Sequence, residues 1–259
     1  MDDLIRLQNK YPRPLIRKKK SKKTNALIKK GRDKAIKIMK MIKKDNLKYK
    51  KFLELGCNDG MVCYYLNSMG KKAIGIDIND KYFDKRALKE EGTLIKMDAS
   101  NLRFEDESFD FVFTFDCFEH FPKPNKVLEE SVRVVRKGGY IYIAFSLPFT
   151  SPYGMHAIKS ITVPYCQYLF PIDLMRRFSH TLKGMRPLPE DLSLNEWSTE
   201  DFRSLWKKHL DKLRIMKYNE NYDISHIKLI SQYPSCFKSK TTNFDNLIVS
   251  SIEVLFKKR

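Results

Sequence analysis

The chain has 259 residues, of which 42% are hydrophobic and 31% charged, and its formal net charge is +19. This length fits one large domain with extensions and is ample for a buried core. No apolar run approaches the roughly 18 residues needed to span a bilayer, which excludes a transmembrane protein. The N-terminus lacks the apolar core of a secretion signal, and the five cysteines are odd in number without CxxC spacing. We therefore expect a cytoplasmic protein with reduced thiols.

The positive charge is concentrated at the N-terminus. Residues 1–51 hold 20 Lys or Arg and 4 Asp or Glu, whereas the other 208 residues hold 30 and 27. The densest part, Arg17 to Lys23, predicts attraction to an anionic partner, either a nucleic acid or the inner face of a membrane. We rank first the alternative that these lysines only solvate helix faces.

An apolar stripe runs through the basic segment between residues 24 and 46. Its spacing predicts a helix that packs onto the following domain, with a membrane-bound amphipathic helix as the second interpretation. The stripe consists of Ala26, Leu27, Ala35, Ile36, Ile38, Met39 and Ile42. The sequence thus predicts a basic helical extension over residues 1–46 and a domain over residues 47–259.

The stretch FLELGCNDG, residues 52–60, predicts a strand, a tight turn and the start of a helix over residues 61–69. Gly56 and Gly60 permit positive φ and a close approach of a ligand to the main chain, and Asn58 tolerates the left-handed region. The helix that follows offers free N–H groups at its start.

Four further strand patterns follow, and three of them end in an acidic residue. KKAIGID ends at Asp77, TLIKMD at Asp98 and FDFVFTFD at Asp116, and GGYIYIAF follows a predicted helix over residues 125–136. Alternating strands and helices predict a parallel sheet covered on both faces, with ligands outside the carboxyl ends of the strands. Asp77 lies 17 positions after Gly60, where a carboxylate can accept hydrogen bonds from a ribose or, in the simpler interpretation, cap the next helix.

In order and spacing, the motifs ELGCNDG, GIDIND, IKMDASNL, FDFVFTFDCFEHF and RKGGYIYIAF resemble those of the class I S-adenosylmethionine-dependent methyltransferases, in particular small-molecule enzymes with an EH pair after strand four. The resemblance covers about residues 47–147. It implies an α/β fold, a Rossmann-like, doubly wound and mostly parallel seven-stranded sheet with an antiparallel last strand. A dinucleotide-binding fold is the competitor, but its GxGxxG signature differs from the GxxxG spacing here.

The resemblance also implies a binding site for S-adenosylmethionine. It puts the methionine part against Glu54, Gly56, Cys57 and Gly60, and the ribose against Asp77 with Ile78 beside it. Asp98 and Ala99 would lie beside the adenine, and Asp116 and Cys117 near the sulfonium. Asn58 departs from the family's usual glycine at that position.

Residues 146–196 form a predicted insert after the fifth strand. Ser146 to Phe178 is rich in proline and aromatic residues and has no strict period, which predicts an ordered loop with short helices. At the strand ends it would form a lid over the substrate; a satellite hydrophobic cluster and a membrane patch are the alternatives. SPYGMH and VPYCQYLFP resemble segments of methyltransferases among sugar and polysaccharide tailoring enzymes.

The C-terminal part predicts a helix over residues 198–210, with Ser198 or Thr199 as its N-cap. Two strands follow, over about residues 212–221 and 246–258, with an irregular segment between them. The resemblance implies that the sheet ends in an antiparallel hairpin, which the terminal strand fits.

Methyl transfer from a sulfonium is an in-line displacement, so positioning of the acceptor supplies much of the catalysis. A hydroxyl acceptor must also lose a proton, and a neutral histidine suits that task. His156 in the insert is the preferred base, with Tyr153 as a second candidate or an orienting hydroxyl. His120 of the EH pair is the other candidate, although a histidine satisfied by the main chain is as good an interpretation. The remaining histidines are expected to be surface or packing residues, namely His180, His209 and His226.

The sequence predicts an S-adenosylmethionine-dependent methyltransferase that acts at oxygen on a small or carbohydrate-type acceptor, without a metal ion. The alternatives are an RNA or ribosomal methyltransferase anchored by the basic leader, a lipid or quinone methyltransferase at a membrane surface, and a non-catalytic binding protein with the same fold.

Overall fold

The computed structural model describes residues 1–12, 22–42, 48–89, 93–183, 185–190, 192, 194–241 and 243–259. The predicted boundary between residues 46 and 47 lies outside the described residues, as does the anionic-partner segment apart from Lys22 and Lys23. Among the described helices, none is both long and apolar enough to cross a membrane.

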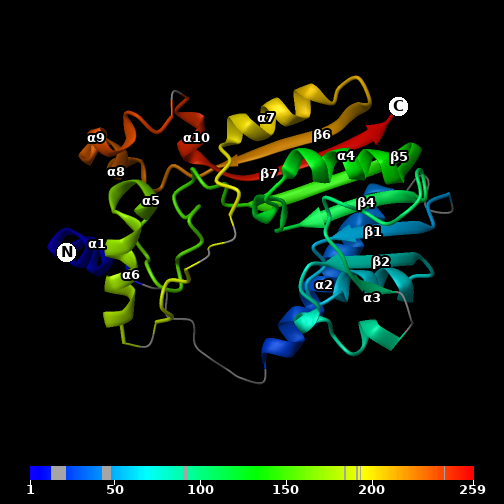
Figure 1. Cartoon of the computed structure of the whole chain (residues 1–259), viewed down its shortest axis with the longest axis horizontal. Coiled ribbons are helices and arrows are strands. Elements are labelled where there is room, and N and C mark those ends of the chain that lie inside the picture. The colour runs from blue at the N-terminus through cyan, green and yellow to red at the C-terminus, as the bar shows by residue number, and fades with distance from the viewer. Residues whose placement is uncertain are drawn as a thin grey trace. The chain divides into compact units, whose positions relative to one another are not determined.

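A seven-stranded sheet organises the chain, with the strand order β3-β2-β1-β4-β5-β7-β6. The pairs β1·β2, β1·β4, β2·β3 and β4·β5 are parallel, and β7, the last strand, runs antiparallel to the others (Figure 1). The predicted fold class is confirmed. The strands are β1 Lys51–Leu55, β2 Lys72–Asp77, β3 Leu94–Lys96, β4 Phe109–Phe115, β5 Val135–Ser146, β6 Leu213–Tyr222 and β7 Val249–Lys258.

Helices lie on both faces of this sheet, with α2 and α3 on the opposite side from α4 (Figure 1). The α-helices are α1 Asp2–Lys10, α2 Lys22–Met41, α3 Met61–Ser68, α4 Pro124–Val134, α5 Cys166–Leu169, α6 Ile172–Thr181, α7 Thr199–Lys208, α8 Ile227–Gln232, α9 Pro234–Phe237 and α10 Asp245–Ile248. The 3₁₀ turns among the described residues are η2 Asp80–Tyr82, η3 Ala87–Lys89 and η4 Phe118–His120.

The described residues divide into two compact units. The sheet unit comprises the described residues within 17–144, 209–218 and 253–259, and the insert unit comprises those within 1–16, 145–208 and 219–252. Each has its own hydrophobic core.

In the sheet unit, α2 packs through the predicted apolar stripe. Ala35, Ile38 and Ile42 are buried in the same cluster as Phe52 and Phe111 of the sheet. A Cβ on Gly31 would lie 2.6 Å from the Cβ of Met61, so glycine at this position allows the backbones of α2 and α3 to approach closely. The prediction of a packed helix is confirmed for these residues, and α2 is therefore a fixed part of the sheet unit.

In the insert unit, α1 joins the core made by the predicted insert. Leu4 and Leu7 are buried with Met155, Val163 and Phe178, among others. The Gln8 side-chain oxygen accepts a hydrogen bond of 2.9 Å from the Thr162 N–H. The insert therefore has a hydrophobic cluster of its own, and it holds short helices, as predicted.

The C-terminal elements differ from the prediction at one boundary. The strand expected from about residue 246 begins at Val249, because residues 245–248 form the helical turn α10. The helix predicted over residues 198–210 is α7, and Ser198 caps it. Ser198 Oγ accepts a hydrogen bond of 3.2 Å from the Asp201 N–H, and Asp201 in turn accepts one of 2.7 Å from the Ser198 N–H. This reciprocal pair is a capping box, with Asp201 in the place of the usual glutamate.

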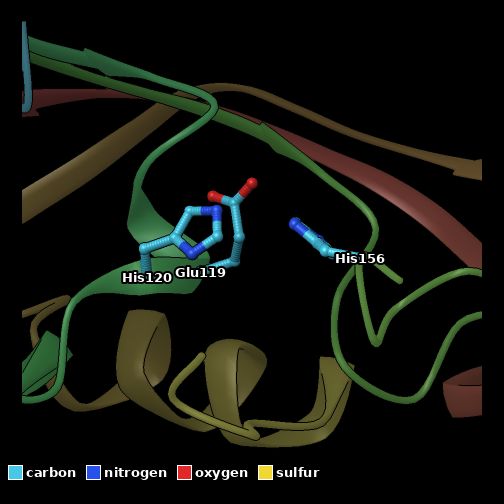
Figure 2. Close-up of side chains that lie close together, drawn as sticks. All are labelled: Glu119, His120 and His156. Carbon is cyan, nitrogen blue, oxygen red and sulfur yellow. The ribbon is translucent and has the colours of Figure 1, made fainter. Parts of the chain in front are cut away.

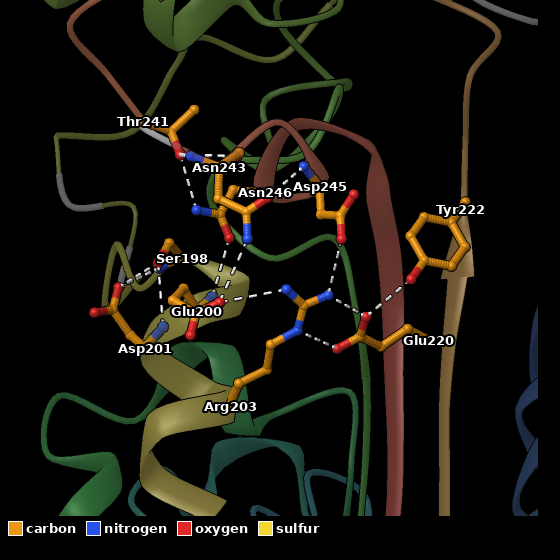
Figure 3. Close-up of polar contacts among 10 residues, drawn as sticks. All are labelled: Ser198, Glu200, Asp201, Arg203, Glu220, Tyr222, Thr241, Asn243, Asp245 and Asn246. Carbon is orange, nitrogen blue, oxygen red and sulfur yellow. Dashed lines mark hydrogen bonds and ion pairs between the residues drawn. The ribbon is translucent and has the colours of Figure 1, made fainter.

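Arg203 of α7 joins three elements of the insert unit through ion pairs (Figure 3). Its guanidinium group forms a two-pronged pair with Glu220 of β6, with N···O distances of 2.9 and 2.6 Å. It also lies 3.3 Å from a Glu200 carboxylate oxygen and 3.5 Å from one of Asp245. The Glu220 side chain is only 6% exposed, so its charge depends on Arg203 for solvation.

We expect Arg203→Met to lower the free energy of unfolding by about 2–4 kcal/mol, because the change leaves the Glu220 carboxylate buried without its main partner. Urea unfolding followed by circular dichroism measures this difference. The control is Lys126→Met, which removes an exposed ion pair with Glu129 and should not shift the midpoint measurably. Equal midpoints for the Arg203 variant and wild type would show that the network contributes no stability.

Candidate functional site

The turn after β1 has the backbone that its sequence predicts. Gly56, Asn58 and Gly60 all have positive φ, at 70°, 50° and 73°. The N–H groups of Gly56 and Cys57 both donate to the Ile76 carbonyl of β2, at 2.8 and 2.9 Å. Asn58 thus takes the left-handed conformation in place of a glycine.

Asp77 lies beside this turn, at the end of β2. Its two carboxylate oxygens each accept a hydrogen bond of 2.9 Å, one from the Asn58 N–H and one from the Asn79 N–H. The first bond fixes the carboxylate to the glycine turn and the second to the chain that follows β2. The acidic residue at the end of β2 is therefore held in one orientation beside the turn.

A hollow of about 340 Å³ lies next to Asp77 at the ends of β2 and β3. Ile78 is 71% exposed there, although it is an aliphatic side chain. Asp98 accepts a hydrogen bond of 2.8 Å from the Ser100 N–H, and the neighbouring Ala99 is buried. An exposed apolar side chain beside polar groups suits a flat, partly polar ring. The hollow is lined by Ile78, Lys96, Met97, Asp98, Asn101 and Arg103.

Glu54 is a buried acid within β1, with a side chain that is 3% exposed. Burial raises the pKa of its carboxyl group to about 8. Two weaker effects lower this pKa, namely a hydrogen bond of 3.2 Å from the Cys63 thiol and the positive charge of Lys34. Near neutral pH the group therefore carries a proton in a large share of molecules. A cationic ligand beside it would favour the ionised form.

The turn after β4 lies against the glycine turn. A Cβ on Gly56 would overlap the Cys117 sulfur and lie 2.9 Å from the Cys117 Cβ, so the two turns touch only because residue 56 is glycine. Asp116 has a positive φ of 50°, and its N–H donates to the Ala144 carbonyl at 2.8 Å. Burial opposes its ionisation, but the positive charges of Lys34 and Lys30 outweigh burial and lower the pKa of its carboxyl group. Burial raises the pKa of the Cys117 thiol, which is therefore neutral.

The EH pair lies on η4, which begins at Phe118, directly after the turn formed by Asp116 and Cys117 (Figure 2). The Glu119 side chain is 4% exposed, and within the described part of the chain its Oε2 has no hydrogen-bond partner. Burial raises the pKa of this carboxyl group to about 8. The His120 N–H donates to the Cys117 carbonyl at 2.9 Å, which closes the turn. Both residues of the pair therefore lie within five residues of the end of β4, in a turn closed by this hydrogen bond.

The other two predicted catalytic residues belong to the insert unit. His156 has a positive φ of 55°, and its Nε2 lies 3.0 Å from the Leu147 carbonyl oxygen. A carbonyl oxygen only accepts, so this Nε2 carries the proton of that bond. The Tyr153 hydroxyl lies 3.1 Å from Nε2 of His226, and burial lowers the pKa of this imidazole. His226 therefore contacts a candidate residue that is 73 positions away in the chain, a pairing that the sequence does not indicate.

The sheet unit brings Glu54, Gly56, Asp77, Asp116 and Cys117 to the carboxyl ends of adjacent strands, with Asp98 at the neighbouring hollow. Sequence reasoning missed Lys30 and Lys34 of α2, whose ammonium groups lie 3.2 and 3.0 Å from the Asp116 carboxylate. The sequence did contain one indication of this pair, because Lys30 and Lys34 are four residues apart and therefore lie on one face of a helix. The roles of the predicted site residues stay proposals.

Comparison with known families matches residues 53–143 to the family described as "Methyltransferase domain". Among relatives, a phthiotriol/phenolphthiotriol dimycocerosates methyltransferase of Mycobacterium leprae is 36% identical over 107 residues, which are 38% of this chain and 38% of that protein. The chain thus spans well under half of that relative. A ubiquinone biosynthesis O-methyltransferase of Chromobacterium violaceum is 26% identical over 170 residues, 57% of this chain and 73% of the relative.

Solved structures share the fold at low sequence identity. The PH0226 protein of Pyrococcus horikoshii superposes with a TM-score of 0.55 at 19% identity, covering 88% of this chain and 91% of that one. A SAM-dependent methyltransferase of Methanosarcina mazei gives a TM-score of 0.50 at 17% identity, covering 81% and 92%. At these identities the likeness concerns the fold alone.

Proposed function

We propose that this chain, which carries a class I S-adenosylmethionine-dependent methyltransferase domain, transfers a methyl group to an oxygen atom of a small acceptor. One observation supports the proposal above the others. The left-handed glycine turn, the anchored Asp77 carboxylate and the Asp116 turn converge at the carboxyl ends of β1, β2 and β4. Ligands of open α/β sheets bind at this edge.

The residues present fit the cofactor. The hollow beside Ile78 and Asp98 suits an adenine ring, and the Asp77 carboxylate suits the ribose hydroxyls. The glycine turn, where Gly56, Asn58 and Gly60 have positive φ, suits the methionine part, and Glu54 of β1 would pair with its ammonium group. When bound, S-adenosylmethionine supplies an electrophilic methyl group on a sulfonium.

The names of the relatives favour an oxygen acceptor on an apolar molecule. Two of them act, by name, on a phthiotriol-type lipid and in ubiquinone biosynthesis. We therefore rank a lipid or quinol hydroxyl above the carbohydrate-type acceptor, and a nucleic-acid acceptor last. His156, His120 and Tyr153 are the proposed groups for positioning the acceptor or taking its proton. The bond between Tyr153 and His226 supports an orienting role for Tyr153.

Transfer of labelled methyl groups tests this proposal. The protein is incubated with S-adenosylmethionine labelled at the methyl carbon and with four acceptor classes: phenolic quinol precursors, long-chain diol lipids, sugar nucleotides and total RNA. We expect label in the first two classes, and its absence with Asp77→Asn, which removes the proposed ribose partner. Transfer of label to sugar nucleotides or RNA would show that the acceptor belongs to that class and not to the lipids or quinols. Binding of the cofactor without transfer to any class would favour a non-catalytic binding protein.

A further inference from the structure

Two lysines of α2 share one carboxylate at the end of β4. Nζ of Lys34 lies 3.0 Å from Asp116 Oδ2, and Nζ of Lys30 lies 3.2 Å from the same oxygen. The Lys34 side chain is 20% exposed and that of Lys30 is 62% exposed. One carboxylate thus faces two ammonium groups, and Lys34 is the more enclosed of the two.

The ring of Phe115 completes the surroundings of Lys34. Its centroid lies 4.6 Å from Lys34 Nζ, a distance at which an aromatic face attracts a cation. The Lys34 charge also lowers the pKa values of the Glu54 and Glu119 carboxyl groups, which burial raises. The Asp116 carboxylate and the Phe115 ring therefore form a place for one cation, which we call the cation seat.

The position of α2 limits how far the Lys34 backbone can move. Ala35 and Ile38 are fully buried, and Gly31 lies against Met61 of α3. The four-carbon side chain of lysine is flexible, so Nζ can leave the cation seat for solvent while the helix stays in place. Occupation of the seat by Lys34 is thus reversible without unfolding of α2.

We propose that Lys34 is a specificity-determining residue whose ammonium group competes with the sulfonium of S-adenosylmethionine for the cation seat. This inference rests on the proposed function, which puts Asp116 near the sulfonium. S-adenosylmethionine carries a positive charge at sulfur and S-adenosylhomocysteine does not. The substrate must therefore displace Lys34, whereas the product does not need the seat. Once the methyl group has left, Lys34 returns to Asp116. The competition therefore lowers the affinity for S-adenosylmethionine relative to that for S-adenosylhomocysteine.

Calorimetric titration of the full chain with both compounds tests the competition. Lys34→Met should raise the ratio of the S-adenosylhomocysteine to the S-adenosylmethionine dissociation constant roughly tenfold, because the seat is then open to the sulfonium, whereas loss of the Lys34 charge near Glu54 affects both compounds alike. Lys30→Met is the matched control. It removes a lysine from the same carboxylate but not from the ring, so its effect on the ratio of the two dissociation constants should be several-fold smaller.

The outcomes separate this inference from the proposed function. If wild type is folded and binds neither compound, the proposed function fails. If both compounds bind and Lys34→Met leaves the ratio unchanged, the competition is absent. If Lys34→Met weakens binding of both compounds equally, Lys34 acts on a part that the two compounds share. That result would also overturn the inference. Thermal unfolding checks each variant, and Lys34→Gln gives the same readout where the methionine variant does not fold.

Discussion

Gly56→Ala should abolish binding of S-adenosylmethionine. A Cβ at residue 56 would overlap the Cys117 sulfur and lie 2.9 Å from the Cys117 Cβ, and the backbone there has a φ of 70°. The turn after β1 and the turn after β4 would have to separate, and both are proposed to hold the cofactor. The left-handed backbone costs an alanine about 1–2 kcal/mol, and the overlap adds roughly 1–3 kcal/mol.

The chain offers a matched control in Gly70→Ala. Gly70 has a φ of 78°, but a Cβ there would meet nothing within 4 Å. This variant therefore bears the backbone cost without the overlap, and it should lose about 1–2 kcal/mol of stability while binding the cofactor normally. Calorimetric titration and urea unfolding of both variants measure the two effects. Normal binding by Gly56→Ala would remove this turn from the cofactor site.

The sequence was a good guide wherever the signal was local. The strand, glycine turn and helix at residues 52–68 follow from alternation, from Gly56 and Gly60, and from the tolerance of Asn58 for positive φ. The capping box at Ser198 and Asp201 is readable for the same reason, because its two partners lie three residues apart. Such features depend on backbone propensities that act within a few residues.

Contacts between distant residues were not predictable in this way. Lys34 and Asp116 are 82 positions apart, and Tyr153 and His226 are 73 apart. Nothing in the pattern of the first twelve residues indicates that Leu4 and Leu7 of α1 would share a core with the insert. These contacts arise from packing of elements whose mutual positions the single sequence does not specify. The candidate acceptor group Tyr153 lies in such a contact, whereas the candidate cofactor residues Gly56 and Gly60 lie in a turn with a local sequence signal.

Binding of S-adenosylmethionine at pH 7 should release a proton from Glu54. The ordinary pKa of the carboxyl group is 4.5, and burial raises it to about 8 in the folded chain. Between these values the folded protein holds a proton that the unfolded chain has lost, so this group's contribution to stability falls as pH rises and levels off above 8. A cofactor ammonium group beside Glu54 favours the carboxylate. Binding should therefore strengthen as pH rises toward 8.

Calorimetry in phosphate and in Tris at pH 7 measures the release, because the two buffers take up protons with different enthalpies. Glu54→Gln should make the binding enthalpy independent of the buffer. Glu119→Gln is the control, since burial raises the pKa of that carboxyl group also to about 8 but it lies on η4. Release that persists in Glu54→Gln and disappears in Glu119→Gln would assign the proton to the EH pair. The cofactor's charge would then act on the turn after β4, beside Asp116, more strongly than on the buried acid of β1.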